Sequence, residues 1–92
     1  MIGSITHKGL AALYYDDQTR GVKQSLVKRL RQILALLATA GTVEDMNLPG
    51  LKFHQLKGNL AEFYAVSVSG NWRVIFRFED GQAIEVNLLD YH

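Results

Sequence analysis

The residues of this sequence best suited to chemistry are one histidine, two arginines, a lysine and a short terminal run that holds a second histidine. They are His54, Lys57, Arg73 and Arg77, followed by Asp90-Tyr91-His92. Histidine titrates near neutral pH and can accept or donate a proton, while arginine and lysine hold phosphate groups well. Metal-free RNA cleavage needs a base for the 2′-hydroxyl, an acid for the leaving 5′-oxygen and cations for the charge that develops on phosphorus. This set of residue types could supply all three.

Each of these residues also has an ordinary structural explanation. A lone strand histidine such as His54 is usually solvated or hydrogen-bonded at the surface, and a terminal residue such as His92 commonly frays. The two arginines would normally pair with acidic neighbours such as Glu62 or Glu85. The lysine opens a Lys-Gly-Asn stretch that is typical of a polar turn. Residue types alone therefore leave the functional and the structural explanations open.

The first half of the chain is expected to form the helices that position these residues. Thr6 is expected to cap a helix that runs to about Asp16, although Gly9 costs that helix about 1 kcal/mol relative to alanine. A longer helix follows, and Gly41 ends it before Thr42 caps a further short turn. Its apolar stripe is spaced as one helix face and comprises Val22, Leu26, Leu30, Ile33, Leu34 and Leu37.

From residue 51 onward the hydrophobic period changes from helical to two. Strands are predicted at residues 51–56, 62–69, 72–78 and 83–88, with a tight hairpin at the Asp-Gly pair after residue 79. A short strand over residues 1–5 precedes the helices. Trp72 is expected in the core, and Ile84, Val86 and Leu88 are expected on one face of the last strand. The fold class is α+β, with helices packed on one face of an antiparallel meander and the polar set on the other.

Composition indicates a soluble globular protein, since 48% of its 92 residues are hydrophobic and 21% are charged. The length suits a single domain over residues 1–92. The absence of cysteine excludes a disulfide and a thiolate, and the histidines lack zinc-type spacing. The N-terminus has no signal-peptide pattern, and the longest apolar run is far short of the ~20 residues that span a bilayer. A cytoplasmic protein without membrane contact is therefore expected.

Charge is unevenly distributed along the chain. Residues 1–58 hold eight Lys and Arg against four Asp and Glu, whereas residues 59–92 hold two against five. A basic half suggests an anionic partner such as nucleic acid, although the excess is small.

Several short motifs occur in a fixed order along the whole chain. They are the opening Ile2-x-x-Ile5-x-His7-Lys8-Gly9-Leu10, then His54 with Leu56-Lys57-Gly58, then Asn71-Trp72-Arg73 before Phe76-Arg77-Phe78, and the terminal Asp90-Tyr91-His92. In this order they resemble the HigB "killer" toxins, which are plasmid-maintenance and host-inhibition proteins of the RelE/ParE superfamily. The resemblance extends over nearly all 92 residues.

The resemblance implies a RelE/ParE-like fold and a ribosome-dependent mRNA interferase that cuts mRNA in the A site without a metal or organic cofactor. It also implies a helix-turn-helix antitoxin of the HigA type, whose complex with the toxin binds operator DNA. By position, His54 and His92 would transfer protons, and Tyr91 would stack or hydrogen-bond. Asp90 would orient the tail or a histidine. Lys57 and Arg73 would hold phosphate, and Arg77 is added to that set on chemical grounds.

The chain departs from the family pattern at one strand position. Ser67 stands between two valines where many relatives carry Arg or Thr, which predicts a weaker grip on RNA. Two alternatives stay open: a ParE-like toxin that poisons DNA gyrase by binding alone, and a non-catalytic antitoxin-binding module. Neither has a chemical need for a strand histidine together with the terminal tripeptide.

Overall fold

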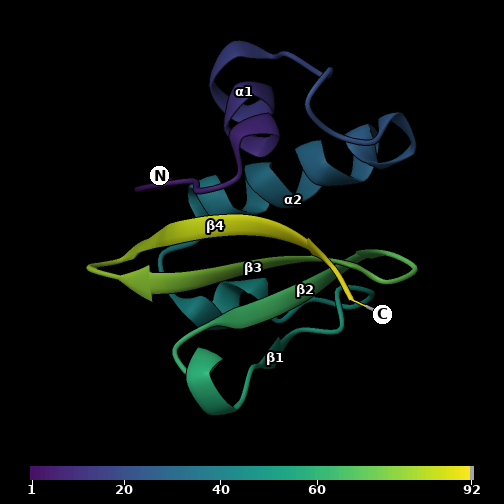
Figure 1. The fold of residues 1–92 in the computed structure, drawn as a ribbon. Helices are drawn as coiled ribbons and strands as arrows, with labels where there is room; N and C mark the ends of the chain where they lie inside the picture. Colours follow the sequence, from purple (N-terminus) through teal and green to yellow (C-terminus); the bar gives the residue numbers. More distant parts are fainter. Residues whose placement is uncertain (92) are drawn as a thin grey trace.

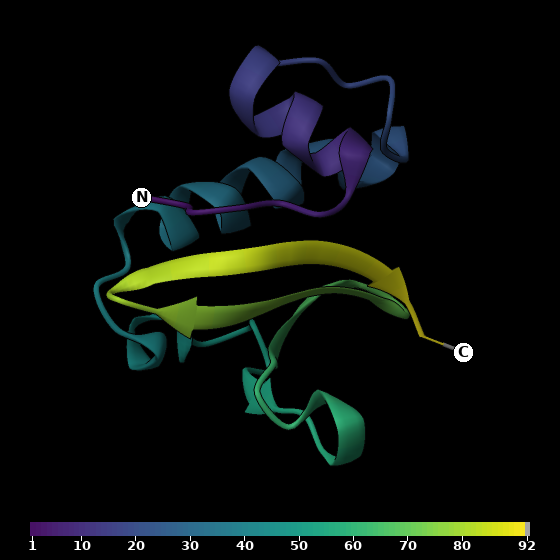
Figure 2. The same ribbon diagram turned by 60° about the vertical axis from the view of Figure 1, so that its left-hand side comes forward.

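In the computed structural model, which describes residues 1–91, two helices lie on the same side of a four-stranded antiparallel sheet (Figures 1 and 2). The helices are α1 (Lys8–Asp16) and α2 (Val27–Thr39). The strands are β1 (His54–Gln55), β2 (Tyr64–Ser69), β3 (Trp72–Glu79) and β4 (Gln82–Asp90), and they neighbour one another in chain order. The predicted α+β class, with helices preceding an antiparallel meander, is confirmed.

Helix α2 forms because its apolar side chains repeat with helical spacing and bury one stripe against the sheet. The predicted stripe is confirmed over its whole length, since all six of its side chains are buried. The α-helix itself starts at Val27, after the 3-10 turn Gln24–Leu26, so it begins five residues later than the stripe. The predicted turn after Gly41 is the 3-10 helix Val43–Met46, and its N-cap is Thr42, as expected.

The N-cap of α1 is His7 rather than Thr6. The Leu10 N–H donates to His7 Nδ1 at 3.0 Å, which gives this histidine a structural role. Thr6 is unavailable as a cap because its N–H donates to the Val86 carbonyl at 2.8 Å, which keeps the chain extended through this residue. The predicted cap was therefore wrong by one residue.

Gly9 is explained by a close backbone approach. A Cβ atom at this position would lie 2.0 Å from the Gly21 carbonyl oxygen, so no larger residue fits without moving the loop. The helix-propensity cost of Gly9 is thus offset by the packing of α1 on the loop before α2.

The N-terminal segment lies beside β4 but pairs with it at only two points. Isolated parallel bridges join Ile2 to Ala83 and Ile5 to Val86, in place of the predicted strand over residues 1–5. Figure 2 shows this segment running along β4 between the sheet and the helices. It covers an edge of the sheet that would otherwise expose unpaired backbone groups.

Strand β1 is much shorter than the predicted strand over residues 51–56. Lys52 has a φ of 50°, in the left-handed region, and this bend prevents an extended conformation before Phe53. The predicted hairpin after β3 is confirmed, because Asp80 and Gly81 both have positive φ values, as a two-residue turn of this kind requires.

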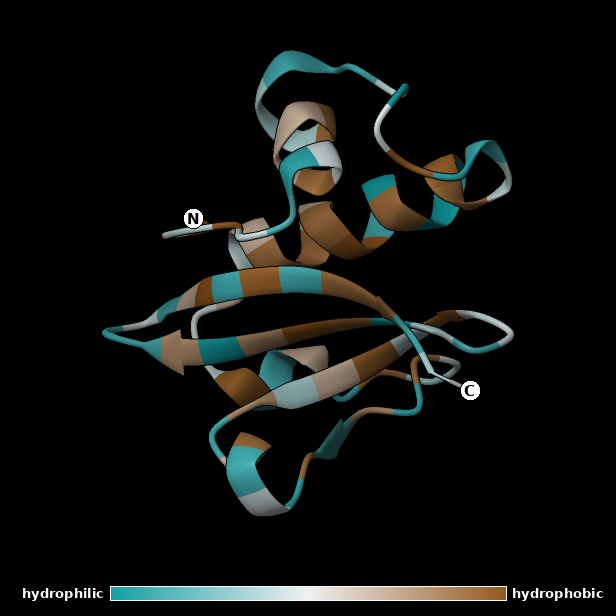
Figure 3. Ribbon diagram, viewed as in Figure 1, coloured by the Kyte–Doolittle hydropathy of each residue, from teal (hydrophilic) through white to brown (hydrophobic). Residues whose placement is uncertain are grey.

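The hydrophobic core lies between the helices and one face of the sheet. Val74 and Phe76 of β3 are fully buried there, and Trp72 packs against the same core while half-buried, as predicted. Figure 3 shows hydrophobic and hydrophilic residues alternating along β4. The predicted face of β4 is wrong at Ile84, which pairs with Arg77 and so lies on the other face, whereas Val86 belongs to the core.

Candidate functional site

Strand register assembles the face of the sheet turned away from the helices, which we call the open face. One row across it is formed by His54 opposite Ala65, Ala65 opposite Ile75, and Ile75 opposite Asn87. Residues directly opposite each other in a ladder share a face, so these four side chains lie on the same side. Ala65 and Ile75 are buried, and they give the centre of this face an apolar floor.

A second row lies two residues along the strands. Ser67 is opposite Arg73, and Arg73 is opposite Leu89. The predicted phosphate-binding Arg73 therefore shares the open face with His54. Strands are about 4.8 Å apart and residues about 3.4 Å apart, so the two Cα atoms are roughly 12 Å apart.

The C-terminal residues divide between the two faces. The Tyr91 N–H donates to the Asn71 carbonyl at 2.8 Å, which extends the ladder one step beyond β4. Alternation then puts Tyr91 on the open face with Arg73. Asp90 is opposite Trp72 and lies on the helix face, so it does not share the open face with the predicted catalytic residues. His92, also predicted as catalytic, lies outside the described residues.

The imidazole of His54 is exposed and oriented by the backbone. Its Nδ1 atom lies 3.0 Å from the Lys52 carbonyl oxygen. A carbonyl oxygen only accepts hydrogen bonds, so Nδ1 carries the proton and donates, and Nε2 is the ring nitrogen left for a substrate. The acceptor residue Lys52 has the left-handed backbone conformation described above. Its contact with His54 could not be predicted from the sequence, because lysine carries no signal for a positive φ.

Arg73 is half-buried and oriented by the turn between β2 and β3. Its Nη1 donates to the Gly70 carbonyl at 2.7 Å and to the Trp72 carbonyl at 2.9 Å. Both acceptors are neutral, so they orient the guanidinium without cancelling its charge. Three of its five N–H donors are left to face a phosphate.

Arg77 lies on the open face but is surrounded by carboxylates. It forms an ion pair with Glu85, and its Nη2 lies 3.7 Å from carboxylate oxygens of both Glu62 and Glu79. The hydrogen bond that Arg77 donates to the Glu85 carboxylate holds the pKa of Arg77 above its usual value. The structure therefore favours the ion-pair explanation for this arginine, with the two glutamates that the sequence singled out.

A β-bulge in β4 brings Glu85 to Arg77. The register of β3 and β4 shifts between Ile75 and Arg77, and Glu85 has a φ of 50°. The N–H of Glu85 donates to the Ser4 hydroxyl at 2.8 Å, so the N-terminal segment satisfies this donor. The extra residue also accounts for the wrong face predicted for Ile84, since a bulge reverses the alternation behind it.

Lys57 lies on the connection between β1 and β2, which projects from the sheet in Figure 1. It precedes the 3-10 helix Gly58–Leu60, as expected of a polar turn, and its side chain is exposed. Lys57 follows Leu56, whose N–H donates to the Phe63 carbonyl at 2.9 Å, so Lys57 lies beyond His54 in the direction away from Arg73.

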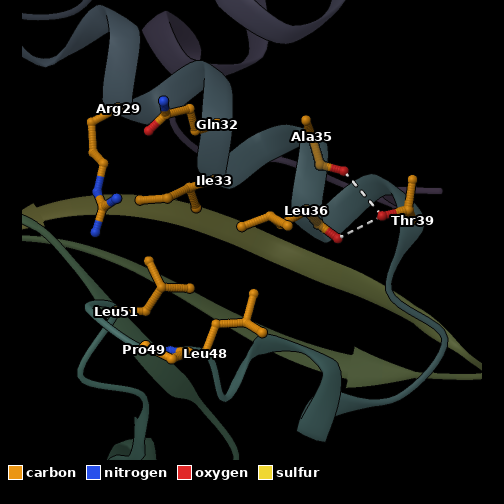
Figure 4. A pocket seen from close by; sticks show the side chains of 9 residues that line it. All are labelled: Arg29, Gln32, Ile33, Ala35, Leu36, Thr39, Leu48, Pro49 and Leu51. Atoms are coloured by element: carbon orange, nitrogen blue, oxygen red, sulfur yellow. Dashed lines mark hydrogen bonds between the residues drawn. The ribbon is translucent and has the colours of Figure 1, made fainter.

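The best-defined hollow of the described surface is not part of the open face. It has a volume of about 560 Å³ and runs along α2 (Figure 4). Ile33 and Leu36 of α2 face Leu48 and Leu51 across it, and Ile33 and Leu51 belong to the core on the helix side. Arg29 stands at one end and donates to the Gly50 carbonyl at 3.1 Å.

Among residues 1–91, no cluster of three or more His, Asp or Glu side chains is arranged to hold a metal ion. No helix in this part of the chain is long and apolar enough to cross a membrane.

Comparison with known proteins identifies the family. The model of the family described as "RelE-like toxin of type II toxin-antitoxin system HigB" matches residues 3–92. The chain is 37% identical to "Endoribonuclease HigB" of Proteus vulgaris over 92 residues, which is all of both chains. It is 32% identical to "Toxin HigB-1" of Vibrio cholerae over 83 residues, 88% of this chain and 87% of the relative.

A solved structure supports the fold independently of the sequence. The YoeB dimer from Staphylococcus aureus superposes with a TM-score of 0.62, covering 97% of this chain and 93% of that one, at 17% identity. The family match and the two relatives rest on sequence, and this likeness rests on backbone geometry. The chain therefore belongs to the HigB-like family of RelE-like toxins of type II toxin–antitoxin systems.

Proposed function

We propose that this protein is an endoribonuclease that cuts mRNA in the ribosomal A site and thereby inhibits translation. The observation that carries the proposal is the grouping of His54, Arg73 and Tyr91 on one face of the sheet, away from the core. The full-length similarity to a relative named as an endoribonuclease supports it.

The proposed reaction uses the 2′-hydroxyl of the RNA as nucleophile. One histidine, His54 or His92, takes the proton of this hydroxyl, and the 2′-oxygen attacks phosphorus. The bond from phosphorus to the 5′-oxygen breaks as the other histidine protonates the leaving oxygen, which gives a 2′,3′-cyclic phosphate and a 5′-hydroxyl. His54 acts through Nε2, because Nδ1 is bound to the Lys52 carbonyl.

Cations on the same face would stabilise the transition state. The guanidinium of Arg73 is bonded to neutral carbonyls, which leaves its charge available, and Lys57, three residues after His54, would add a second positive charge. Tyr91 would stack on or hydrogen-bond to the RNA from the far end of the face. Asp90, on the helix face of the same strand end, would fix the course of the tail that carries His92.

His54 and Tyr91 lie at opposite edges of the open face. His54 is on edge strand β1, and Tyr91 follows β4, three strands away and four residues further along the sheet, so their Cα atoms are roughly 20 Å apart. Arg73 lies between them, so an RNA strand would cross the open face from the His54 edge past Arg73 to Tyr91.

The position of the hollows supports a need for the ribosome. Those of about 560 and 480 Å³ border α2, on the helix side, and His54 lines neither of them. A positioning partner would supply the orientation that this surface lacks, and orientation accounts for a large part of most rate enhancements.

Membership of a type II family implies an antitoxin that binds this protein. We propose that it is a helix-turn-helix protein of the HigA type and that its complex with the toxin binds operator DNA. Expression without this antitoxin should arrest growth, whereas a non-catalytic antitoxin-binding module would leave growth unaffected.

The test is primer-extension mapping of one mRNA in a purified translation system. Wild-type protein should cut within A-site codons only when ribosomes are present, and His92→Ala should abolish or strongly reduce the cuts. Intact mRNA in every lane would overturn the nuclease proposal. DNA breaks and an SOS response in cells, before translation stops, would instead support a gyrase poison.

A further inference from the structure

We propose that Phe63 is a stacking platform for a nucleobase next to the cleaved phosphate, an inference that rests on the proposed nuclease function. Phe63 immediately precedes β2, and its carbonyl accepts a hydrogen bond from the Leu56 N–H at 2.9 Å. This bond continues the β1–β2 ladder by one pair beyond Gln55. Since Ala65 and His54 lie on the open face, alternation puts Phe63 and Leu56 there too.

The environment of Phe63 differs from that of an aromatic residue in the core. Its side chain is half-buried. Unlike the partly buried aromatic residues of β2 and β3, it does not pack against the core that the described residues form. Phe53 provides the contrast: it is also half-buried, packs against the core, and stacks on Tyr64 with ring centroids 5.5 Å apart. Phe63 therefore presents aromatic surface on the face that carries the candidate chemistry.

The charged groups near Phe63 favour a base over a phosphate at this position. By register Phe63 is next to Arg77, whose charge is compensated by Glu62, Glu79 and Glu85. Three carboxylates around one guanidinium give a net negative charge, which disfavours a phosphate directly over Arg77. A base carries no formal charge and stacks on an aromatic ring whatever its sequence identity.

Spacing supports the same assignment. Phe63 is two residues along and one strand across from His54, so their Cα atoms are about 8 Å apart. This distance lets a base lie on Phe63 while its own or the adjacent phosphate reaches the histidine. The phosphate then lies toward Arg73, and the base lies toward Arg77.

The test is single-turnover cleavage on programmed ribosomes by wild type and by Phe63→Leu, Phe63→Tyr and Phe53→Leu variants. Phe63→Leu should lose about 5- to 100-fold in rate at subsaturating enzyme, as expected for one stacked base, and Phe63→Tyr should restore most of it. Phe53→Leu is the matched control, with a lower melting temperature and an unchanged rate in its folded fraction.

An abasic nucleotide at each A-site codon position in turn then identifies the base. The wild type should lose rate at one position, and Phe63→Leu should lose little more there, because the two changes remove the same contact. Wild-type rates for Phe63→Leu, or equal abasic losses in both proteins, would overturn the stacking assignment while leaving the nuclease intact. Absence of any cleavage by the wild type would instead remove the proposed function and this inference with it.

Discussion

Two arginines of the same strand, Arg73 and Arg77, lie on the same face of the sheet and have different surroundings. Arg73 is bonded to two neutral carbonyl oxygens of its own turn, and its charge remains available. Arg77 is surrounded by three carboxylates. One arginine can therefore hold a phosphate, whereas the other is committed to the fold, although residue type, strand and face are shared.

The difference has its origin in a single extra residue of β4. The bulge at Glu85 brings this carboxylate to Arg77, and Ser4 of the N-terminal segment satisfies the backbone N–H of the bulged residue. No such irregularity in β4 lies opposite Arg73, which pairs regularly with Leu89. The different surroundings of the two arginines thus depend on backbone geometry more than on side-chain type.

The largest expected effect is at the histidine end of the open face. His54→Ala should reduce single-turnover cleavage by about 10²- to 10⁴-fold, the usual contribution of one proton-transfer group. His7→Asn is the matched control, because asparagine can still cap α1 and the rate should be unchanged. A His54→Ala protein that cuts at the wild-type rate would remove the catalytic role of this end.

Releasing Arg77 from its carboxylates should make the two arginines more alike. Glu62→Gln combined with Glu85→Gln leaves Glu79, 3.7 Å away, as the one carboxylate of the three beside this guanidinium, so affinity for single-stranded RNA should rise and its salt dependence should steepen by up to about one phosphate contact. A salt titration of RNA binding measures both quantities. Unchanged binding would mean that the carboxylates do not determine where RNA can lie.

Adding a cation beside Arg73 should sharpen the contrast. Ser67 is opposite Arg73 on the open face, at the position where the sequence departs from the family pattern. Ser67→Arg should strengthen RNA binding several-fold at low salt, because a second guanidinium faces the phosphate. Ser69→Arg, at an exposed position near the end of β2, controls for net charge and should have a smaller effect.

The smallest expected effect is on stability and lies away from the open face. N–H groups of Gly41 and Thr42 donate to Asp45 and lower the pKa of its carboxyl group below the usual value. A lowered pKa in the folded state means that this interaction stabilises the fold above about pH 4 and is lost as the pH falls further. Asp45→Asn should therefore unfold more easily than wild type at pH 6, with the difference shrinking toward pH 3. A constant difference across this range would contradict the assignment.

Much of the architecture could be predicted from hydrophobic period. The helical stripe, the three longer strands β2, β3 and β4, and the Asp-Gly hairpin depend on local spacing, and the structure confirms each of them. The same period brought His54 and Arg73 to one face, since alternation fixes the side of every residue once a strand is aligned.

The features that local spacing could not supply depend on partners far away in the chain. The N-cap of α1 is His7 rather than the predicted Thr6, because Thr6 is hydrogen-bonded to Val86. Strand β1 is shorter than predicted because Lys52 adopts a positive φ. The face of Ile84 depends on the exact alignment of β3 and β4, which a bulge alters, whereas the face of Asp90 follows regular alternation from Leu88. Periodicity cannot locate a bulge, because a single inserted residue changes no local propensity.

The most direct test of this account is a side-by-side measurement of Arg73→Gln and Arg77→Gln, each assayed for single-turnover cleavage on programmed ribosomes and for thermal unfolding. Arg73→Gln should lose most of its cleavage rate with little change in melting temperature, because a charge aimed at phosphate is removed. Arg77→Gln should lower the melting temperature and leave the rate of the folded protein near that of wild type. Equal rate losses in the two variants would contradict the division of the open face into a phosphate-binding end and a structural end.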